Sequence, residues 1–252
     1  MRFLRAWHSY FKNNRLSQGN ISWEAEDDVV SSEEALLIGK SIAAFQLGEY
    51  SEGRGLLKAA EEYSRNLGDD LLFEITQLFV KEEQNHALLL KRFMRSHGIP
   101  LLKKHWTDTV FRGLRKYFSY ESSVTVLITA EIISLVYYKA LKNCTGSKVL
   151  HSICDKILMD ERAHVTYESE MIRYMRGQKS RAYRLTVRLL HRFLFLGTVL
   201  VVYFDHRKVF GKGGYGFIRF WKSCWPEFSA CFSLERKLVL KRLFKLPPDN
   251  FI

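Results

Sequence analysis

Residues 124–138 read VTVLITAEIISLVYY, an apolar stretch with a single acidic residue, Glu131. A helix over about residues 121–142 accommodates this stretch and ends at the turn residues 143–146. Burying a lone carboxylate among apolar side chains costs several kcal/mol unless it is paired or binds a metal ion. Glu131 therefore predicts a polar or metal site inside a helical bundle.

The helix after this turn carries a matching acid. It starts after Ser147, a residue type that commonly caps helices. In an antiparallel hairpin, residues equidistant from the turn lie at the same height, and Glu131 and Glu161 have Gly146 as their midpoint. Glu161 also opens a Glu-x-x-His sequence that ends at His164. At this spacing, the carboxylate and the imidazole project from one helical face and can reach a shared metal ion.

The same motif occurs once more in the chain, at Glu83 and His86. These two residues lie on a predicted helix that begins near Leu71 and stops at His97-Gly98-Ile99-Pro100. Two Glu-x-x-His motifs on two separate helices are suited to hold one shared metal site between the helices.

An earlier helix starts where Ser31 and Glu34 have capping-box spacing, and it runs to a turn at residues 66–70. Two of its acids, Glu49 and Glu52, have midpoints with the glutamate of the next helix that fall in this turn. The spacing alone does not separate these two candidates.

These elements predict an all-α fold of two antiparallel hairpins joined by a long crossover, which together make a four-helix bundle. The crossover has about twenty residues and includes a short helix near residues 110–117. We expect an amphipathic N-terminal segment at residues 1–30, the bundle at residues 31–177, and a basic, aromatic helical extension at residues 178–252.

The order Glu, Glu-x-x-His, Glu, Glu-x-x-His resembles the ferritin-like di-iron carboxylate superfamily over about residues 33–176. Phe45-Gln46-Leu47-Gly48-Glu49 looks like the Gly-Glu of the rubrerythrin first helix, which favours Glu49 over Glu52. The resemblance implies that Glu83 and Glu161 bridge two metal ions, that each histidine binds one ion, and that two further glutamates are terminal ligands. The implied ligand set is Glu49, Glu83, His86, Glu131, Glu161 and His164.

The resemblance also implies two iron ions, although the same ligands suit manganese or a mixed Mn/Fe pair. Six ligands for two ions leave positions open for O2. We therefore expect an O2-dependent di-iron oxygenase or oxidase that acts on a small or acyl-type apolar substrate, with an electron-donor protein, as a homo-oligomer. A di-iron tRNA hydroxylase and a ferroxidase or peroxide scavenger are the alternatives. Aminobenzoate-type N-oxygenases carry a further histidine where this chain has Ile157, which disfavours that activity.

Positive charge is concentrated in the last third of the chain. The net charge is +12, and residues 173–252 carry 17 Lys/Arg against four Asp/Glu. Residues 180–204 predict a basic amphipathic helix whose apolar run, Phe193–Phe204, is too short to span a bilayer, since spanning takes about 20 residues. This composition favours an anionic membrane surface or an acidic carrier protein as a partner, with RNA as the alternative.

The remaining signals concern location and the edges of the site. Four cysteines without a CxxC pair, and an N-terminus without an uninterrupted apolar segment, predict a cytoplasmic protein that can also lie at a membrane. An N-terminal aromatic stripe that includes Trp7 and Phe11 predicts a helix docked on the bundle.

Other residues near the predicted site have two possible roles each, one functional and one structural. Glu52, Asp160 and Glu168 could orient the histidines or could be solvated charges. Tyr138 faces the same way as Glu131 and could be a hydrogen-bonding residue or a core aromatic. The glycine-rich residues 211–216 predict a flexible loop, because they lack the spacing of a phosphate-binding loop.

Overall fold

The computed structural model describes residues 2–16, 21, 23, 28–51, 53–104 and 119–231. These residues form helices joined by turns and irregular segments, with no strand among them, which confirms the all-helical prediction. The predicted short helix near residues 110–117 and the candidate Glu52 lie outside the described residues.

The first long helix expected from the sequence is divided in two. α2 covers Ser32–Ser51 and α3 covers Arg54–Leu67. Between them, Gly53 has φ 144° and ψ −70°, a backbone conformation that residues other than glycine rarely adopt. A Cβ at this position would also lie 3.0 Å from Val80 Cγ1. The prediction of one continuous helix is therefore wrong, because Gly53 redirects the chain shortly after Glu49.

Polar caps fix where the long helices start. The Ser31 backbone N donates to Glu34 Oε2 at 2.9 Å, and the Glu34 N donates to Ser31 Oγ at 3.1 Å, which is the predicted capping box. The other carboxylate oxygen of Glu34 accepts from the Gly146 N at 2.8 Å. The start of α2 is thereby held against the turn that joins α6 (Tyr120–Lys142) to α7 (Lys148–Gly177).

The other helix boundaries agree with the sequence signals. α4 covers Leu71–Ser96 and follows a turn in which Gly68 has φ 66°. At the start of α7, Ser147 Oγ accepts from the Leu150 N at 3.0 Å, as expected for an N-cap. The two turns fold α4 back along α3 and α2, and α7 back along α6.

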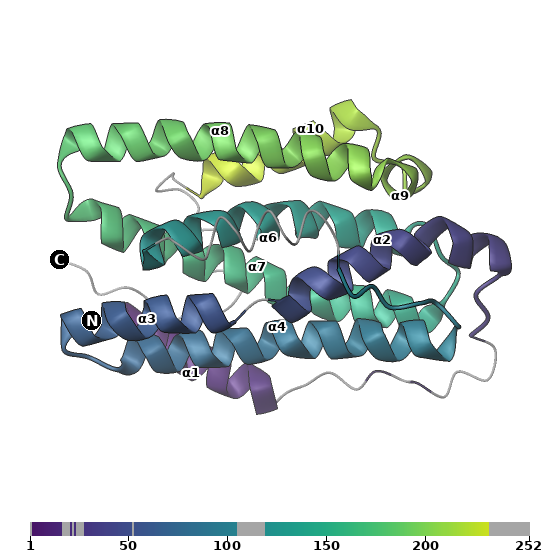
Figure 1. The fold of residues 1–252 in the computed structure, drawn as a ribbon, viewed down its shortest axis with the longest axis horizontal. Coiled ribbons are helices and arrows are strands. Elements are labelled where there is room, and N and C mark those ends of the chain that lie inside the picture. The colour runs from purple at the N-terminus through teal and green to yellow at the C-terminus, as the bar shows by residue number, and fades with distance from the viewer. Residues whose placement is uncertain are drawn as a thin grey trace.

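Three layers are visible in Figure 1. α8 (Arg181–Asp205) and α10 (Phe217–Ala230) form one outer layer, and α1 (Arg2–Leu16), α3 and α4 lie on the opposite side. α6 and α7 lie between these layers and pack extensively on each other. Because α4 contacts both α2 and α7, the four helices α2, α4, α6 and α7 surround a common interior.

The N-terminal helix α1 docks on this bundle, as its aromatic stripe predicts. Trp7 and Phe11 are buried in the same core as the long helices. Trp7 Nε1 also donates to Glu170 of α7 at 2.7 Å, and α1 packs along α4. α1 therefore contributes buried side chains to the core of the bundle.

The glycine-rich segment is ordered by close packing. Its first two residues, Gly211 and Lys212, end α9 (Arg207–Lys212), and Gly213 is buried against α6. The Gly213 carbonyl accepts from Asn143 Nδ2 at 3.0 Å. A Cβ on Gly213 would lie 2.4 Å from the Ala140 carbonyl oxygen. The prediction of a flexible loop is wrong here, because only a residue without a side chain lets the two backbones approach this closely.

Two of the described helices, α6 and α8, are long and apolar enough to cross a membrane by length and composition. For α6, 89% of its most apolar segment is buried inside the protein, whereas for α8 the share is 28%. α8 confirms the helix predicted over residues 180–204, which extends well beyond the apolar run Phe193–Phe204 because Arg188 and Arg192 do not end it. α6 is thus the core helix, and α8 leaves most of its apolar surface uncovered.

His191 lies on the buried face of α8, which packs on α6. Thr129 Oγ1 donates to the Thr125 carbonyl, so it accepts from His191 Nε2 at 3.1 Å. Burial, together with the positive charge of Arg176, lowers the pKa of His191 from 6.5 to about 3. His191 is therefore a neutral imidazole at physiological pH.

We expect His191 to reduce stability in mild acid. The unfolded chain binds a proton on this residue near pH 6.5, but the folded chain does so only near pH 3, so the free energy of unfolding falls as the pH drops through this window. The penalty at pH 5 is about 2 kcal/mol. His191→Gln keeps an N–H donor and cannot titrate. In urea unfolding, the variant should lose about 2 kcal/mol less than the wild type between pH 7.5 and pH 5. If both proteins lost the same free energy of unfolding over this pH range, the neutral state assigned to His191 would be contradicted.

Candidate metal centre

The structure brings all six sequence-predicted ligand residues together in the bundle interior. Glu49 comes from α2, Glu83 and His86 from α4, Glu131 from α6, and Glu161 and His164 from α7. Every one of these side chains is buried, with at most 7% of its residue exposed. They form two groups that share Glu83, and the potential ligand atoms within each group lie within 4.8 Å of one another. The groups are Glu49, Glu83, His86 and Glu161, and Glu83, Glu131 and His164.

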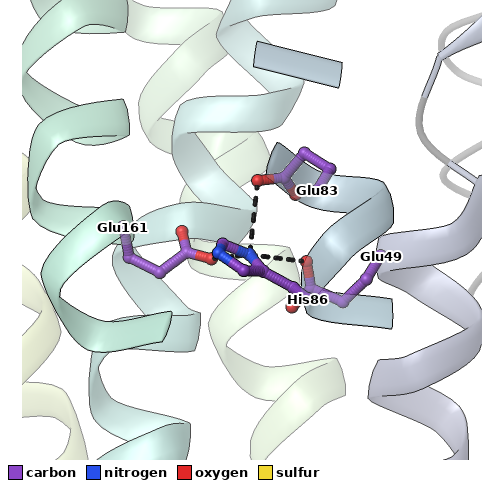
Figure 2. A group of neighbouring side chains, drawn as sticks. All are labelled: Glu49, Glu83, His86 and Glu161. Carbon is purple, nitrogen blue, oxygen red and sulfur yellow. Dashed lines mark ion pairs between the residues drawn. The ribbon is translucent and has the colours of Figure 1, made fainter. Parts of the chain in front are cut away.

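The first group is arranged around the imidazole of His86, as Figure 2 shows. His86 Nδ1 lies 3.6 Å from one carboxylate oxygen of each of three glutamates, Glu49, Glu83 and Glu161. These distances are longer than hydrogen bonds. Donor atoms that share a metal ion about 2.1 Å from each of them are about 3–4 Å apart, so the spacing suits four ligands of one cation.

The second group is arranged around His164. Its Nδ1 lies 3.0 Å from Glu83 Oε1 and 3.8 Å from Glu161 Oε2. Glu131 completes the group from the facing helix α6. Glu83 and Glu161 therefore each face both imidazoles, whose ring centroids are 5.8 Å apart.

The outer nitrogen of each histidine meets a carboxylate from the other motif-bearing helix. His86 Nε2 lies 2.8 Å from Asp160 Oδ2 of α7, and His164 Nε2 lies 3.0 Å from Glu82 Oε2 of α4. Each of these acids directly precedes the glutamate of its own Glu-x-x-His motif. The contact turns Nδ1 of each ring toward the interior, since a carboxylate partner holds the N–H at Nε2.

Two further residues support these outer carboxylates. Asn14 of α1 donates from Nδ2 to Glu82 Oε1 at 2.8 Å and to Asp160 Oδ1 at 2.9 Å. Lys156 forms an ion pair with Asp160 one helical turn away. Asp160 was a sequence candidate and is buried next to His86, so the reading as a solvated charge is wrong for it.

Glu82 and Asn14 were missed by the sequence analysis. The paired acids Glu82-Glu83 and Asp160-Glu161, each at the start of a Glu-x-x-His motif, were the available signal for Glu82. Asn14 had no such signal, because its role depends on where α1 docks.

Charge within the cluster favours bound protons and cations. Burial opposes protonation of His86, but its hydrogen bond to Asp160, its contact with Glu49 and the charge of Glu83 raise its pKa to about 10. Although burial acts in the opposite direction, close contact with His86 and its charge lower the pKa of Asp160 and that of Glu49. Positive charge placed among these carboxylates is therefore strongly stabilised.

Tyr138 takes the hydrogen-bonding role that the sequence left open. Its hydroxyl donates to Glu49 Oε1 in a short contact of 2.5 Å. Burial, and then the charge of Glu49, raise the pKa of Tyr138 well above 10, so the phenol keeps its proton. Glu168 is also buried, and its charge acts on Tyr120 and Tyr167, so it is not a solvated residue either.

A polar pocket of about 240 Å³ opens on the outer side of the cluster. Glu82 and Asp160 reach its wall, together with Asn14, Lys156 and residues of α4. Beside His164, the ring of Phe79 lies 4.5 Å from the imidazole and that of Phe11 6.0 Å away, centroid to centroid. The cluster thus has one wall that is polar and one that is apolar.

Comparisons of the chain with protein-family models, with curated proteins and with solved structures found no match. The geometry of the buried Glu/His cluster therefore carries the functional argument, and it is compatible with the binding of a metal ion.

Proposed function

We propose that the chain is a ferritin-like di-iron oxidoreductase that uses O2 to oxidise a small or acyl-type apolar substrate. The observation that carries this proposal is the convergence of four glutamates and two histidines, from four helices, in the buried bundle interior. Carboxylates and imidazoles are the ligands of non-haem iron, and their burial excludes the reading of ordinary surface charges.

The two groups support distinct ligand roles. Glu83 and Glu161 each face both imidazoles, which suits carboxylates that bridge two ions. Glu49 belongs only to the group of His86, and Glu131 only to that of His164, which suits terminal ligands. We assign one ion to each histidine on this basis.

The charge balance points the same way. His86, His164 and Lys156 contribute at most three positive charges to six carboxylates, which are the four inner glutamates, Glu82 and Asp160. Excess buried negative charge is costly, by several kcal/mol per uncompensated ion. Two divalent cations with neutral imidazoles would bring the cluster close to neutrality.

The protein's own groups hold and shield the site. Iron in this ligand set supplies the one- and two-electron chemistry with O2. Asp160 and Glu82 fix the tautomer of each histidine so that Nδ1 faces inward. Tyr138 holds a proton next to Glu49, and Phe79 excludes water beside His164.

The polar pocket favours a second candidate function, ferroxidase activity with iron as the substrate. Its wall is formed in part by Glu82 and Asp160, which would attract hydrated cations toward the cluster. Iron loading well beyond two ions per chain would support this candidate over the oxygenase.

Iron content tests the proposal directly. Protein reconstituted with Fe(II) in the absence of O2 should hold about two irons per chain, because the two groups provide two sites. Glu83→Ala and His164→Ala should each lose at least one ion and all O2-dependent turnover. Full iron content in both variants, by elemental analysis, would remove the site assignment.

Two matched pairs sharpen the test. Asp160→Asn should weaken iron binding about 10- to 100-fold, because the partner of His86 is lost. Asp155→Asn should not weaken iron binding, because Asp155 is an exposed acid of the same helix and pairs with Lys142.

The second pair tests the ligand from α2. Glu49→Ala should disrupt the metal site, and Glu52→Ala should be far milder. The reverse result in the second pair would move the ligand along the chain to Glu52.

A further inference from the structure

α8 has two unlike faces. One face packs on α6 and α10 and buries His191, Phe195, Val199 and Val202. The other face exposes a line of large apolar residues at spacings of three or four along the whole helix. This line consists of Leu185, Leu189, Phe193, Leu196, Leu200 and Phe204.

The exposed apolar surface is concentrated here. Among the described residues, eleven of the seventeen exposed large apolar side chains lie on α8 and α10. Phe193 and Ile218 are each at least 70% exposed, and the rings of Phe204 and Phe217 lie 6.5 Å apart, so the two helices form one surface. Soluble proteins rarely expose an apolar surface this continuous unless it binds a partner.

Positive charge accompanies this surface. Between residues 181 and 231 the chain has nine lysines and arginines, all exposed, and two acids. Four of the cations, Arg181, Arg184, Arg188 and Arg192, lie on the first half of α8, among its exposed leucines. A helix that combines an exposed apolar line with many cations is typical of binding to an anionic membrane surface.

We propose that the α8 face, defined as the exposed apolar line of α8 with Phe217, Ile218 and the cations of α8–α10, binds the surface of an anionic lipid bilayer. The helix lies parallel to the membrane plane, its leucines and phenylalanines enter the boundary between headgroups and acyl chains, and its arginines contact the lipid phosphates.

Two other occupants fit the observations less well. In a symmetric dimer formed through this face, the cations of one copy would meet those of the other, and like charges repel. A membrane-spanning α8 would have to leave α6, yet its buried face carries His191 and Thr198, whose polar atoms are packed inside the protein. Binding at the surface keeps this packing intact.

The proposal also has a geometric consequence for the metal centre. α8 packs directly on α6, and α6 carries Glu131. A bilayer on the α8 face would therefore lie one helix away from the candidate metal centre. The membrane proposal itself rests on α8 to α10 alone and does not require that the cluster bind iron.

Vesicle sedimentation of the full chain tests the proposal. We expect the protein to sediment with vesicles of phosphatidylcholine mixed with phosphatidylglycerol, less with vesicles of phosphatidylcholine alone, and less at physiological salt than at low salt. A parallel assay with tRNA at both salt concentrations measures the competing partner class.

Matched variants locate the binding surface. Phe193→Asp/Phe204→Asp should reduce partitioning onto the mixed vesicles at least about tenfold. Arg184→Glu/Arg188→Glu, in which two cations are lost, should reduce it about 30-fold or more at low salt. The control Val29→Asp/Leu36→Asp adds the same charge at two exposed apolar positions outside the face and should leave partitioning unchanged. All these positions are exposed, and circular dichroism checks that each variant is folded.

Three results would overturn the proposal. These are tRNA binding without vesicle binding, equal loss of vesicle binding in the control variant, and a wild-type dimer that becomes monomeric in Phe193→Asp/Phe204→Asp without any vesicle binding. Glu161→Gln separates this proposal from the proposed function, because it should alter iron binding and leave vesicle binding as in the wild type.

Discussion

Glu161→Gln should make the chain more stable in the presence of a chelator and abolish its stabilisation by iron. Glu161 is fully buried and faces His86 and His164 through its two oxygens. In a cluster that holds more carboxylates than cations, replacing one of them with a neutral amide of the same shape relieves repulsion. We expect a gain of about 1–3 kcal/mol in the free energy of unfolding without metal.

The same variant should behave in the opposite way when iron is added. A ligand that binds only the folded chain stabilises it by an amount that grows with its concentration, by about 2.7 kcal/mol at 100 times the dissociation constant. The wild type should gain this stability under anaerobic Fe(II), and Glu161→Gln should gain little.

Urea unfolding with chelator and with Fe(II) measures both effects. Glu61→Gln is the matched control, because Glu61 is exposed and pairs only with Arg65 among the contacts observed for it. It should change stability by less than about 1 kcal/mol in either condition. If the cluster were a structural ion-pair network, Glu161→Gln would instead destabilise the chain with chelator, and iron would make no difference to either protein.

Gly213→Ala is expected to be among the most destabilising substitutions outside the cluster. The added Cβ would lie 2.4 Å from the Ala140 carbonyl oxygen and 2.8 Å from its Cα. Both are backbone atoms in the last turn of the core helix α6, so no side chain can move aside. We expect a loss of about 2–4 kcal/mol, equivalent to a fall in Tm of about 5–15 °C.

Gly211→Ala gives the contrast. Gly211 lies in α9, two residues earlier, and a Cβ there meets no atom within 4 Å. Alanine also favours helix over glycine by up to about 1 kcal/mol, so this variant should be neutral or slightly stabilised. Similar thermal denaturation curves for the two variants would show that the close approach of Gly213 to α6 does not contribute to stability.

The long helices could be placed from the sequence because their ends carry local signals. Ser31, Ser147 and Ser180 each accept a hydrogen bond at the helix start that follows them. Such contacts involve residues three apart, and a sequence reading can find them. The break at Gly53 was missed, although the polar segment Ser51–Gly55 with its two glycines was the available signal.

The candidate site was predictable in its inner part and not in its outer part. Glu83 and His86 are neighbours on one helix face, so their spacing indicates their shared direction. The contact of Glu82 with His164 joins residues 82 positions apart, and that of Asn14 with Asp160 joins residues 146 positions apart. Such contacts depend on the docking of whole helices, which local patterns do not specify.

The exposure of α8 was predictable in part, because its cations already indicated a basic amphipathic helix. α6 and α8 are both long and apolar enough to cross a membrane, but α8 carries four arginines in its first half. The packing of neighbouring helices then shows how much of each apolar surface is covered, which composition does not give.

The outer nitrogen of each histidine contacts a carboxylate from the other helix, so α4 and α7 complete each other. This arrangement has a consequence for synthesis of the chain. While the ribosome has made only the first hairpin, His86 has neither Asp160 nor Glu161, and Glu82 has no histidine to hold. A nascent chain therefore presents scattered carboxylates with no ordered pair of imidazoles. The assembled cluster, and with it any tight hold on a redox-active ion, arises only after residue 164 has emerged and α7 has packed on α4. Unfinished chains therefore lack the complete Glu/His cluster while core residues are still exposed.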